Sequence, residues 1–211
     1  MLTAGNPATA GLGLVLLHGR GAGPEGIVDL ARMLGREDVA VAAPAAPGNS
    51  WWPTSFLAPA AQMEPWVGRG LDAADAAIAH LTEGGLDRSA VAVAGFSQGG
   101  CLALEYGARR GAGLRAVLGL SAGLVGTSDE GAPSPELYGH AGKAFGYDTD
   151  LSGVRAVVST HTQDPHIPLA RARESVRVLE GLGAEVTSNF PEGAMHGVTE
   201  WDLAQMRRLL G

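Results

Sequence analysis

Cysteine is nearly absent from this chain of 211 residues. The one cysteine, Cys101, cannot form an internal disulfide, and its place on the apolar side of a helical segment predicts a small buried packing side chain. A reactive thiol is the alternative. The histidines and this cysteine show neither an HExxH nor a paired-cysteine spacing, so we expect no metal site and no cofactor.

Long apolar runs and blocks of positive charge are also missing. The apolar stretch 12–17 is far too short to cross a bilayer, and the segment before it lacks the basic flank of a secretory signal, so we expect a cytoplasmic protein without a membrane span. Lys and Arg number 15 against 22 Asp and Glu, a net charge of -7, which argues against nucleic acid as a partner. A small neutral molecule fits better. A homodimer has no support in the sequence.

Segments typical of strands and helices alternate along the chain. We expect strands over 14–17, 39–43, 91–94, 114–120, 155–159 and 186–190, and helices over 24–34, 64–81, from 98 onward, 169–182 and 198–210. This alternation indicates the α/β class, with a mostly parallel, doubly wound sheet, helices on both faces, and one domain over residues 1–211. Ligands of such sheets bind beyond the carboxyl ends of the strands.

Two irregular stretches interrupt this pattern. The stretch 44–65 is rich in proline and carries the aromatic residues Trp51, Trp52 and Phe56, so we expect it to be partly exposed and functional. The stretch 121–151 is rich in Gly, Ser and Asp.

Residues 91–100, VAVAGFSQGG, place Ser97 in a Gly-x-Ser-x-Gly turn between a predicted strand and a predicted helix. A serine that attacks a carbonyl is held at the tip of such a turn, where only very small neighbours fit two residues to either side. Gly95 and Gly99 meet this demand, which favours Ser97 as a nucleophile. The alternative is a serine that merely caps the following helix.

A serine nucleophile needs a general base and a carboxylate that orients the base. His196 follows the last predicted strand, and Asp164 follows the strand 155–159 in a loop that prolines stiffen. The order Ser97, Asp164, His196 is the one expected on an α/β-hydrolase sheet. Taken singly, Asp164 could be a turn residue and His196 a helix-start residue.

Two backbone amides are candidates for stabilising the negative charge of a tetrahedral intermediate. These are the N–H groups of Gln98, directly after the serine, and of Arg20, in the glycine-rich loop after the first strand. Phosphate binding is the competing interpretation of that loop. It lacks the Lys and Ser/Thr of a P-loop and the GxGxxG spacing, so we do not expect a nucleotide.

The motifs together resemble one family. LLHGRGAG, GFSQGG, DPHIP and MHGV are similar, in order and over nearly the whole chain, to segments of the phospholipase/carboxylesterase group of α/β-hydrolases. The resemblance implies an α/β-hydrolase fold, a triad of Ser97, Asp164 and His196, and an oxyanion hole formed by the amides of Arg20 and Gln98. NSWWPTSFLAP and the following EPW resemble the aromatic substrate loop of small bacterial esterases in this group, whereas YGHAGKAFGYDTD resembles none of its segments.

The resulting hypothesis is a serine carboxylesterase that hydrolyses small to medium acyl or aryl esters through an acyl-enzyme intermediate. Core packing is the alternative for each side chain of the expected apolar pocket, which comprises Trp51, Trp52, Phe56, Leu57, Met63 and Trp66. An acyl thioesterase or lysophospholipase would use the same groups. A noncatalytic binding protein with a hydrolase fold is the rival from another class, and a dienelactone-type hydrolase is disfavoured because Ser97 stands where a cysteine is expected.

Overall fold

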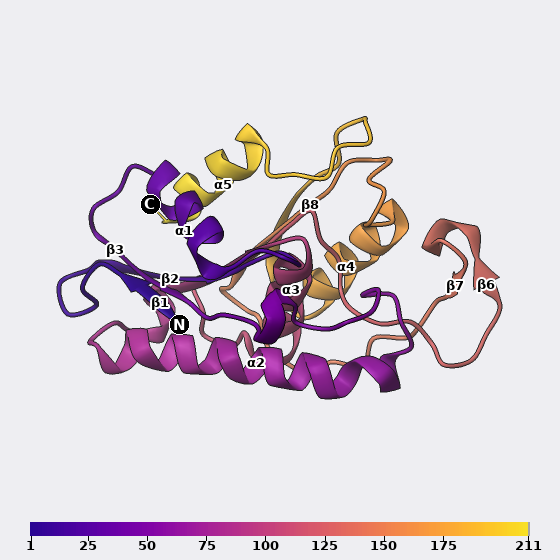
Figure 1. Cartoon of the computed structure of the whole chain (residues 1–211), viewed down its shortest axis with the longest axis horizontal. Helices are drawn as coiled ribbons and strands as arrows, with labels where there is room; N and C mark the ends of the chain where they lie inside the picture. The colour runs from indigo at the N-terminus through magenta and orange to yellow at the C-terminus, as the bar shows by residue number, and fades with distance from the viewer. Residues whose placement is uncertain (211) are drawn as a thin grey trace.

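The computed structural model describes residues 1–210 and contains a seven-stranded sheet (Figure 1). In spatial order the strands are β1 (Leu2–Ala4), β3 (Val39–Ala43), β2 (Leu12–Leu17), β4 (Val91–Phe96), β5 (Ala116–Leu120), β8 (Arg155–Ser159) and β9 (Glu185–Asn189). All neighbouring pairs are parallel except β1 and β3. The expected class and doubly wound sheet are therefore confirmed.

Helices cover both faces of this sheet (Figure 1). One face carries α1 (Pro24–Met33) and α5 (Glu200–Leu210), and the other carries α2 (Ala60–Glu83), α3 (Gln98–Arg110) and α4 (Leu169–Gly181). Short 3-10 turns occur at Pro47–Asn49, Arg88–Ala90 and Pro135–Leu137.

The central strand β4 shows why the sheet needs two cores. Val91 and Val93 belong to the apolar cluster under α2, α3 and α4, whereas Ala92 and Ala94 belong to the cluster under α1 and α5. Successive side chains of a strand point to opposite faces, so a strand covered on both sides must be apolar throughout. This arrangement buries β4 and brings its carboxyl end to the middle of one edge of the sheet.

Two expectations about elements were wrong. The sequence analysis missed β1, a short edge strand with mostly exposed side chains. It started α2 at residue 64, but the helix begins at Ala60, whose N–H donates to the carbonyl of Thr127. The earlier start keeps Met63 on the buried stripe of the helix, one turn before Val67.

The stretch 121–151 contains a two-stranded hairpin formed by β6 (Pro133–Ser134) and β7 (His140–Ala141). The hairpin projects from the body of the molecule at the end away from the N-terminus (Figure 1). The aromatic residues of the stretch 44–65, expected to be partly exposed, are instead buried: Trp51, Trp52 and Phe56 are 5%, 1% and 8% exposed.

Candidate active site

Ser97 lies at the junction of β4 and α3 with φ 55° and ψ −119°. A positive φ is uncommon for a residue with a side chain, and it stores strain that the surrounding structure must hold. The N–H of Ser97 donates to the carbonyl of Leu120, and its carbonyl accepts from the N–H of Cys101. The strained turn is thereby fixed from both sides.

The glycines flanking Ser97 are required by close backbone contacts. A Cβ on Gly95 would lie 2.2 Å from the carbonyl oxygen of Gly99, and a Cβ on Gly99 would lie 2.0 Å from the carbonyl oxygen of Leu17. Real Cβ atoms do not approach backbone oxygens this closely. The Gly-x-Ser-x-Gly spacing therefore serves the sharp turn from strand to helix.

The hydroxyl of Ser97 makes no capping bond to α3, so the interpretation of this residue as a helix cap was wrong. Its Oγ instead lies 2.8 Å from Nε2 of His196. On the other side of the ring, Nδ1 of His196 lies 2.8 Å from Oδ2 of Asp164. An ionised carboxylate only accepts hydrogen bonds, so Nδ1 carries the proton and Nε2 accepts from the serine.

Asp164 is fully buried in the loop after β8 and accepts four hydrogen bonds. Besides His196, its donors are the hydroxyl of Thr160 and the backbone N–H groups of His166 and Ile167. Burial alone would raise the pKa of Asp164, but the hydrogen bonds from His196 and the backbone hold that pKa below its ordinary value. The carboxylate therefore stays ionised beside the imidazole.

Two aromatic rings enclose the imidazole of His196. The ring of Phe96 lies 5.1 Å from it between centroids, and the ring of His166 meets it edge-on at 4.8 Å. The hydrogen bond to Asp164 directs Nε2 of this imidazole toward Ser97.

The N–H groups of Arg20 and Gln98 donate to no other group in the described part of the chain. Gln98 is the first residue of α3, where backbone donors lack partners within the helix and favour negative charge. Arg20 follows β2, the parallel neighbour of β4. The two free donors thus lie just beyond the carboxyl ends of adjacent strands.

The side chains of the same two residues hold the aromatic loop. Oε1 of Gln98 accepts from the N–H of Trp51 at 2.9 Å, and its Nε2 donates to the carbonyl of Trp52 at 2.8 Å. The guanidinium of Arg20 donates to the carbonyls of Pro53, at 3.2 Å, and Thr54. The loop is therefore tied to the residues whose amides are unpaired.

A cavity of about 550 Å³ opens at Ser97. Its lining comprises Gly19, Arg20, Ala22, Trp52, Ser55, Phe56, Phe96, Ser97, Gln98, Cys101, His166, Ile167 and His196. Burial raises the pKa of the Cys101 thiol to about 12, so this side chain is a neutral part of the wall.

Of the side chains expected to line a pocket, Trp52 and Phe56 lie in the lining of this cavity. The other predicted lining residues pack elsewhere: Trp51 stacks on His18 and donates to its carbonyl, Leu57 and Met63 belong to the core, and Trp66 is 38% exposed beneath Arg69. Met63 faces the core because α2 begins at Ala60 and places this side chain on the buried stripe of the helix.

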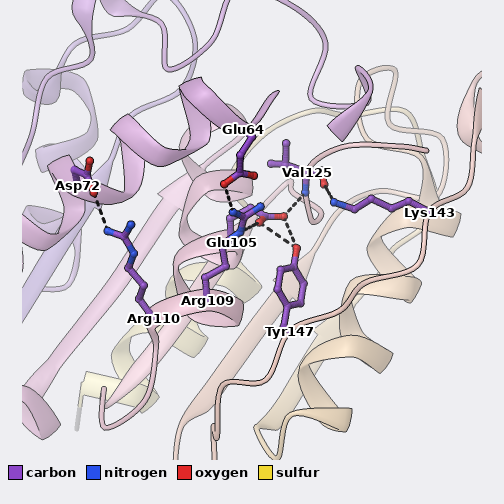
Figure 2. Close-up of polar contacts among 8 residues, drawn as sticks. All are labelled: Glu64, Asp72, Glu105, Arg109, Arg110, Val125, Lys143 and Tyr147. Carbon is purple, nitrogen blue, oxygen red and sulfur yellow. Dashed lines mark hydrogen bonds and ion pairs between the residues drawn. The ribbon is translucent and has the colours of Figure 1, made fainter. Parts of the chain in front are cut away.

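Hydrogen bonds of Glu105 and Lys143 connect α3 and the segment 143–147 to Val125 (Figure 2). Glu105, fully buried on α3, accepts from the N–H of Val125, the hydroxyl of Tyr147 and Nε of Arg109. Lys143 donates to the carbonyl of Val125 (Figure 2).

The segment held in this way contacts the aromatic loop directly. The N–H of Gly126 donates to the carbonyl of Phe56 at 2.7 Å. The hydroxyl of Thr127 donates to the carbonyl of Leu57, also at 2.7 Å. On the other side, the buried guanidinium of Arg171 donates to the carbonyls of Leu124 and Gly126. Residues 143–147, which resembled no family segment, therefore help to position a cavity wall.

Sequence reasoning assigned no role to two histidines near the site. The ring of His166 lines the cavity. The ring of His18 holds two loops together: its Nε2 accepts from the N–H of Ala46 at 3.0 Å and its Nδ1 donates to the carbonyl of Gly19 at 2.8 Å. A histidine between a strand and a glycine-rich loop was the available signal.

Among residues 1–210, no cluster of three or more His, Cys, Asp and Glu side chains could hold a metal ion. Within the same residues, no helix combines the length and the apolar character needed to span a membrane.

A family model described as Phospholipase/Carboxylesterase matches residues 5–131. The chain is 30% identical to a phospholipase/carboxylesterase from Dyadobacter fermentans, with a TM-score of 0.86, over 100% of this chain and 95% of that one. Two further structures share the fold at lower identity. A Bacillus cereus carboxylesterase is 17% identical with a TM-score of 0.73 over 99% and 92% of the chains, and a Mesorhizobium loti carboxylesterase is 21% identical with a TM-score of 0.70 over 99% and 92%. A search of curated proteins finds no match.

Proposed function

Because the chain belongs to the phospholipase/carboxylesterase family of α/β-hydrolases, we propose that it is a serine carboxylesterase with Ser97, His196 and Asp164 as its catalytic triad. The observation that carries this proposal is the continuous set of hydrogen bonds from Ser97 Oγ through the imidazole to the buried carboxylate, at the mouth of an apolar cavity. This arrangement supplies a nucleophile, a base and an orienting anion in one place.

In the proposed reaction, Oγ of Ser97 attacks the ester carbonyl carbon while Nε2 of His196 takes the hydroxyl proton. Asp164 stabilises the imidazolium that forms. The carbonyl oxygen becomes negative and accepts from the N–H groups of Arg20 and Gln98, donors that are worth about 10²–10³ in kcat each in other hydrolases.

The tetrahedral intermediate then collapses. The bond to the alcohol oxygen breaks, that oxygen takes the proton from Nε2 of His196, and the alcohol leaves behind an acylated Ser97. A water molecule, which gives its proton to the same nitrogen, then attacks the acyl carbon. The second tetrahedral intermediate collapses, the proton returns to Oγ of Ser97, and the carboxylic acid is released. The volume of about 550 Å³ and the apolar walls suit small to medium acyl or aryl esters.

Labelling with a fluorophosphonate probe and assays with 4-nitrophenyl esters from acetate to octanoate test this proposal together. We expect the wild type to react with the probe and to prefer the shorter esters, and Ser97→Ala to lose labelling and about 10⁶-fold in kcat. Ser55→Ala is a matched control because Ser55 lines the same cavity and lies outside the triad. An unlabelled wild type, or an active Ser97→Ala, would overturn the proposal in favour of a noncatalytic protein or another nucleophile.

A further inference from the structure

We propose that His166 recognises the alcohol part of the substrate and selects esters whose alcohol carries a second hydroxyl group near the ester oxygen. This inference rests on the proposed ester hydrolysis and adds the substrate class on the leaving-group side. Three observations on His166 support this inference: the ring lies next to His196, it is exposed at the cavity, and its nitrogen atoms make no hydrogen bond within residues 1–210.

The geometry of proton transfer places the alcohol next to His196. When the tetrahedral intermediate collapses, the departing oxygen must lie within hydrogen-bonding distance of Nε2 of His196, because that nitrogen returns the proton. The alcohol therefore leaves along the side of the cavity that adjoins this imidazole. His166 lines the cavity and contacts the imidazole edge-on, at 4.8 Å between centroids.

His166 is held in this place by its backbone. Its N–H donates to Oδ1 of Asp164 at 2.8 Å, and the same oxygen accepts from the N–H of Ile167. The backbone of His166 thus supports the carboxylate, while its ring is exposed at the cavity. Substituting the side chain leaves the backbone hydrogen bond in place.

The ring of His166 has hydrogen-bonding capacity that nothing in residues 1–210 uses. Neither ring nitrogen has a partner in this part of the chain. The other polar side chains at the cavity outside the triad each make hydrogen bonds within the chain: Arg20 donates to two carbonyls, Gln98 bonds Trp51 and Trp52, and Ser55 accepts from the N–H of Leu57.

A neutral imidazole offers one donor and one acceptor, which is the pattern that a hydroxyl group satisfies. The cavity lining also contains the apolar side chains of Phe96 and Ile167, which offer no hydrogen bond. A polar atom of the alcohol therefore finds its partner on this side in His166. Esters of glycerol and similar polyols have a hydroxyl at the required place, whereas esters of simple alkanols do not.

The test compares 1-monobutyrylglycerol with n-propyl butyrate, which share the acyl group and the length of the alcohol. The quantity compared is kcat/KM for the glycerol ester divided by kcat/KM for the propyl ester. We expect His166→Leu to lower this ratio by about three- to tenfold, the range of one uncharged hydrogen bond. His166→Gln, which keeps a donor and an acceptor, should retain most of the wild-type ratio. The deacylation rate, measured after a burst with 4-nitrophenyl butyrate, should fall by a smaller factor than kcat/KM for the glycerol ester, because the alcohol has then left.

Contrary outcomes separate the two proposals. If the wild type cleaves both esters, Ser97→Ala cleaves neither, and His166→Leu leaves the ratio unchanged, the inference fails while the proposed function stands. If His166→Leu slows both esters and deacylation equally, the ring only positions His196, and the inference fails as well. A wild type that cleaves neither ester and resists fluorophosphonate overturns both.

Discussion

Ser121 and Gly197 are joined by a pair of hydrogen bonds between the loop after β5 and the loop that carries His196. Oγ of Ser121 donates to the carbonyl of Gly197 at 3.0 Å and accepts from its N–H at 3.3 Å. Ser121 is 1% exposed and has φ 46°, so this contact is buried and its backbone is strained. The residue directly after His196 is thereby tied to the centre of the sheet.

We expect Ser121→Ala to lower kcat for a 4-nitrophenyl ester by about tenfold or more, because small displacements of a catalytic group are costly. Chemical unfolding should show a free energy of unfolding lower by about 1–3 kcal/mol, since both backbone groups of Gly197 lose their partner. Ser159→Ala is the control: Ser159 is also buried, but its hydroxyl has no partner within residues 1–210. Equal effects of the two substitutions would contradict a positioning role for Ser121.

The glycines of the serine turn give a second prediction. Gly95→Ala and Gly99→Ala each place a methyl group against backbone atoms, at 2.2 and 2.0 Å from the nearest oxygen. Backbone cannot move aside as a flexible side chain does, so we expect both variants to lose most activity and several kcal/mol of stability. Gly68→Ala in α2, where a Cβ meets nothing within 4 Å, should instead stabilise the protein by about 0.5–1 kcal/mol. Thermal unfolding of all three variants, with activity assays, provides the measurement.

The side chains of Gln98 and Arg20 can be separated from their amides. Gln98→Ala keeps the N–H at position 98 but leaves the buried N–H of Trp51 without its acceptor, so we expect a loss of about 1–3 kcal/mol in stability and about tenfold in kcat/KM. Arg20→Ala removes bonds from an exposed guanidinium and should cost less on both measures. Urea unfolding and ester kinetics decide the ranking. A larger effect of Arg20→Ala would contradict the view that Gln98 is the main tie of the aromatic loop.

The order of strands and helices could be predicted from the sequence because a parallel sheet leaves periodic signals. The strands 39–43 and 155–159 have the expected bounds, since runs of Val and Ala fit a sheet that is covered on both faces. The carboxyl ends of such strands meet at one edge, so the predicted loops of Ser97, Asp164 and His196 lie together. The order of these residues in the sequence and their positions after strands were therefore enough to predict that their loops are close together.

The cavity lining could not be predicted in the same way. The direction of Trp51 depends on its bond to the carbonyl of His18, and that of Met63 depends on where α2 begins. Both are set by contacts between residues far apart in the sequence, such as the bond from the N–H of Ala60 to Thr127. Local patterns contain no information on such contacts.

The lowered pKa of Asp164 predicts an acid-dependent stability. Burial opposes ionisation, but bonds from His196 and the backbone outweigh it, so the folded pKa lies below the unfolded value of about 3.9. Stability from this group is then fully present above that value and is lost as pH falls through the folded pKa. We expect the free energy of unfolding to fall below about pH 4, and to fall less steeply in Asp164→Asn. Asp129→Asn, at an exposed position, should follow the wild type.

The same variant tests the role of the carboxylate in the reaction. Asp164→Asn replaces an acceptor by an amide that also donates, so the imidazole loses its preferred tautomer, and we expect kcat to fall by about 10⁴-fold. An activity within tenfold of the wild type would contradict the proposed triad even if the acid dependence of stability followed the expectation.

Arg109 bonds one buried carboxylate, Glu105, and one exposed carboxylate, Glu64 (Figure 2). Substituting each of them separates the effect of burial from that of the ion pair. Glu105→Gln introduces an amide donor where Val125, Tyr147 and Arg109 all donate, so at least one buried group must lose its partner. We expect the free energy of unfolding of this variant to fall by about 3–5 kcal/mol. Glu64→Gln changes the other partner of Arg109, whose side chain is 58% exposed, and should cost less than about 1 kcal/mol. Urea unfolding of both variants measures the difference, and similar values would show that burial of Glu105 contributes little to the support of the cavity wall.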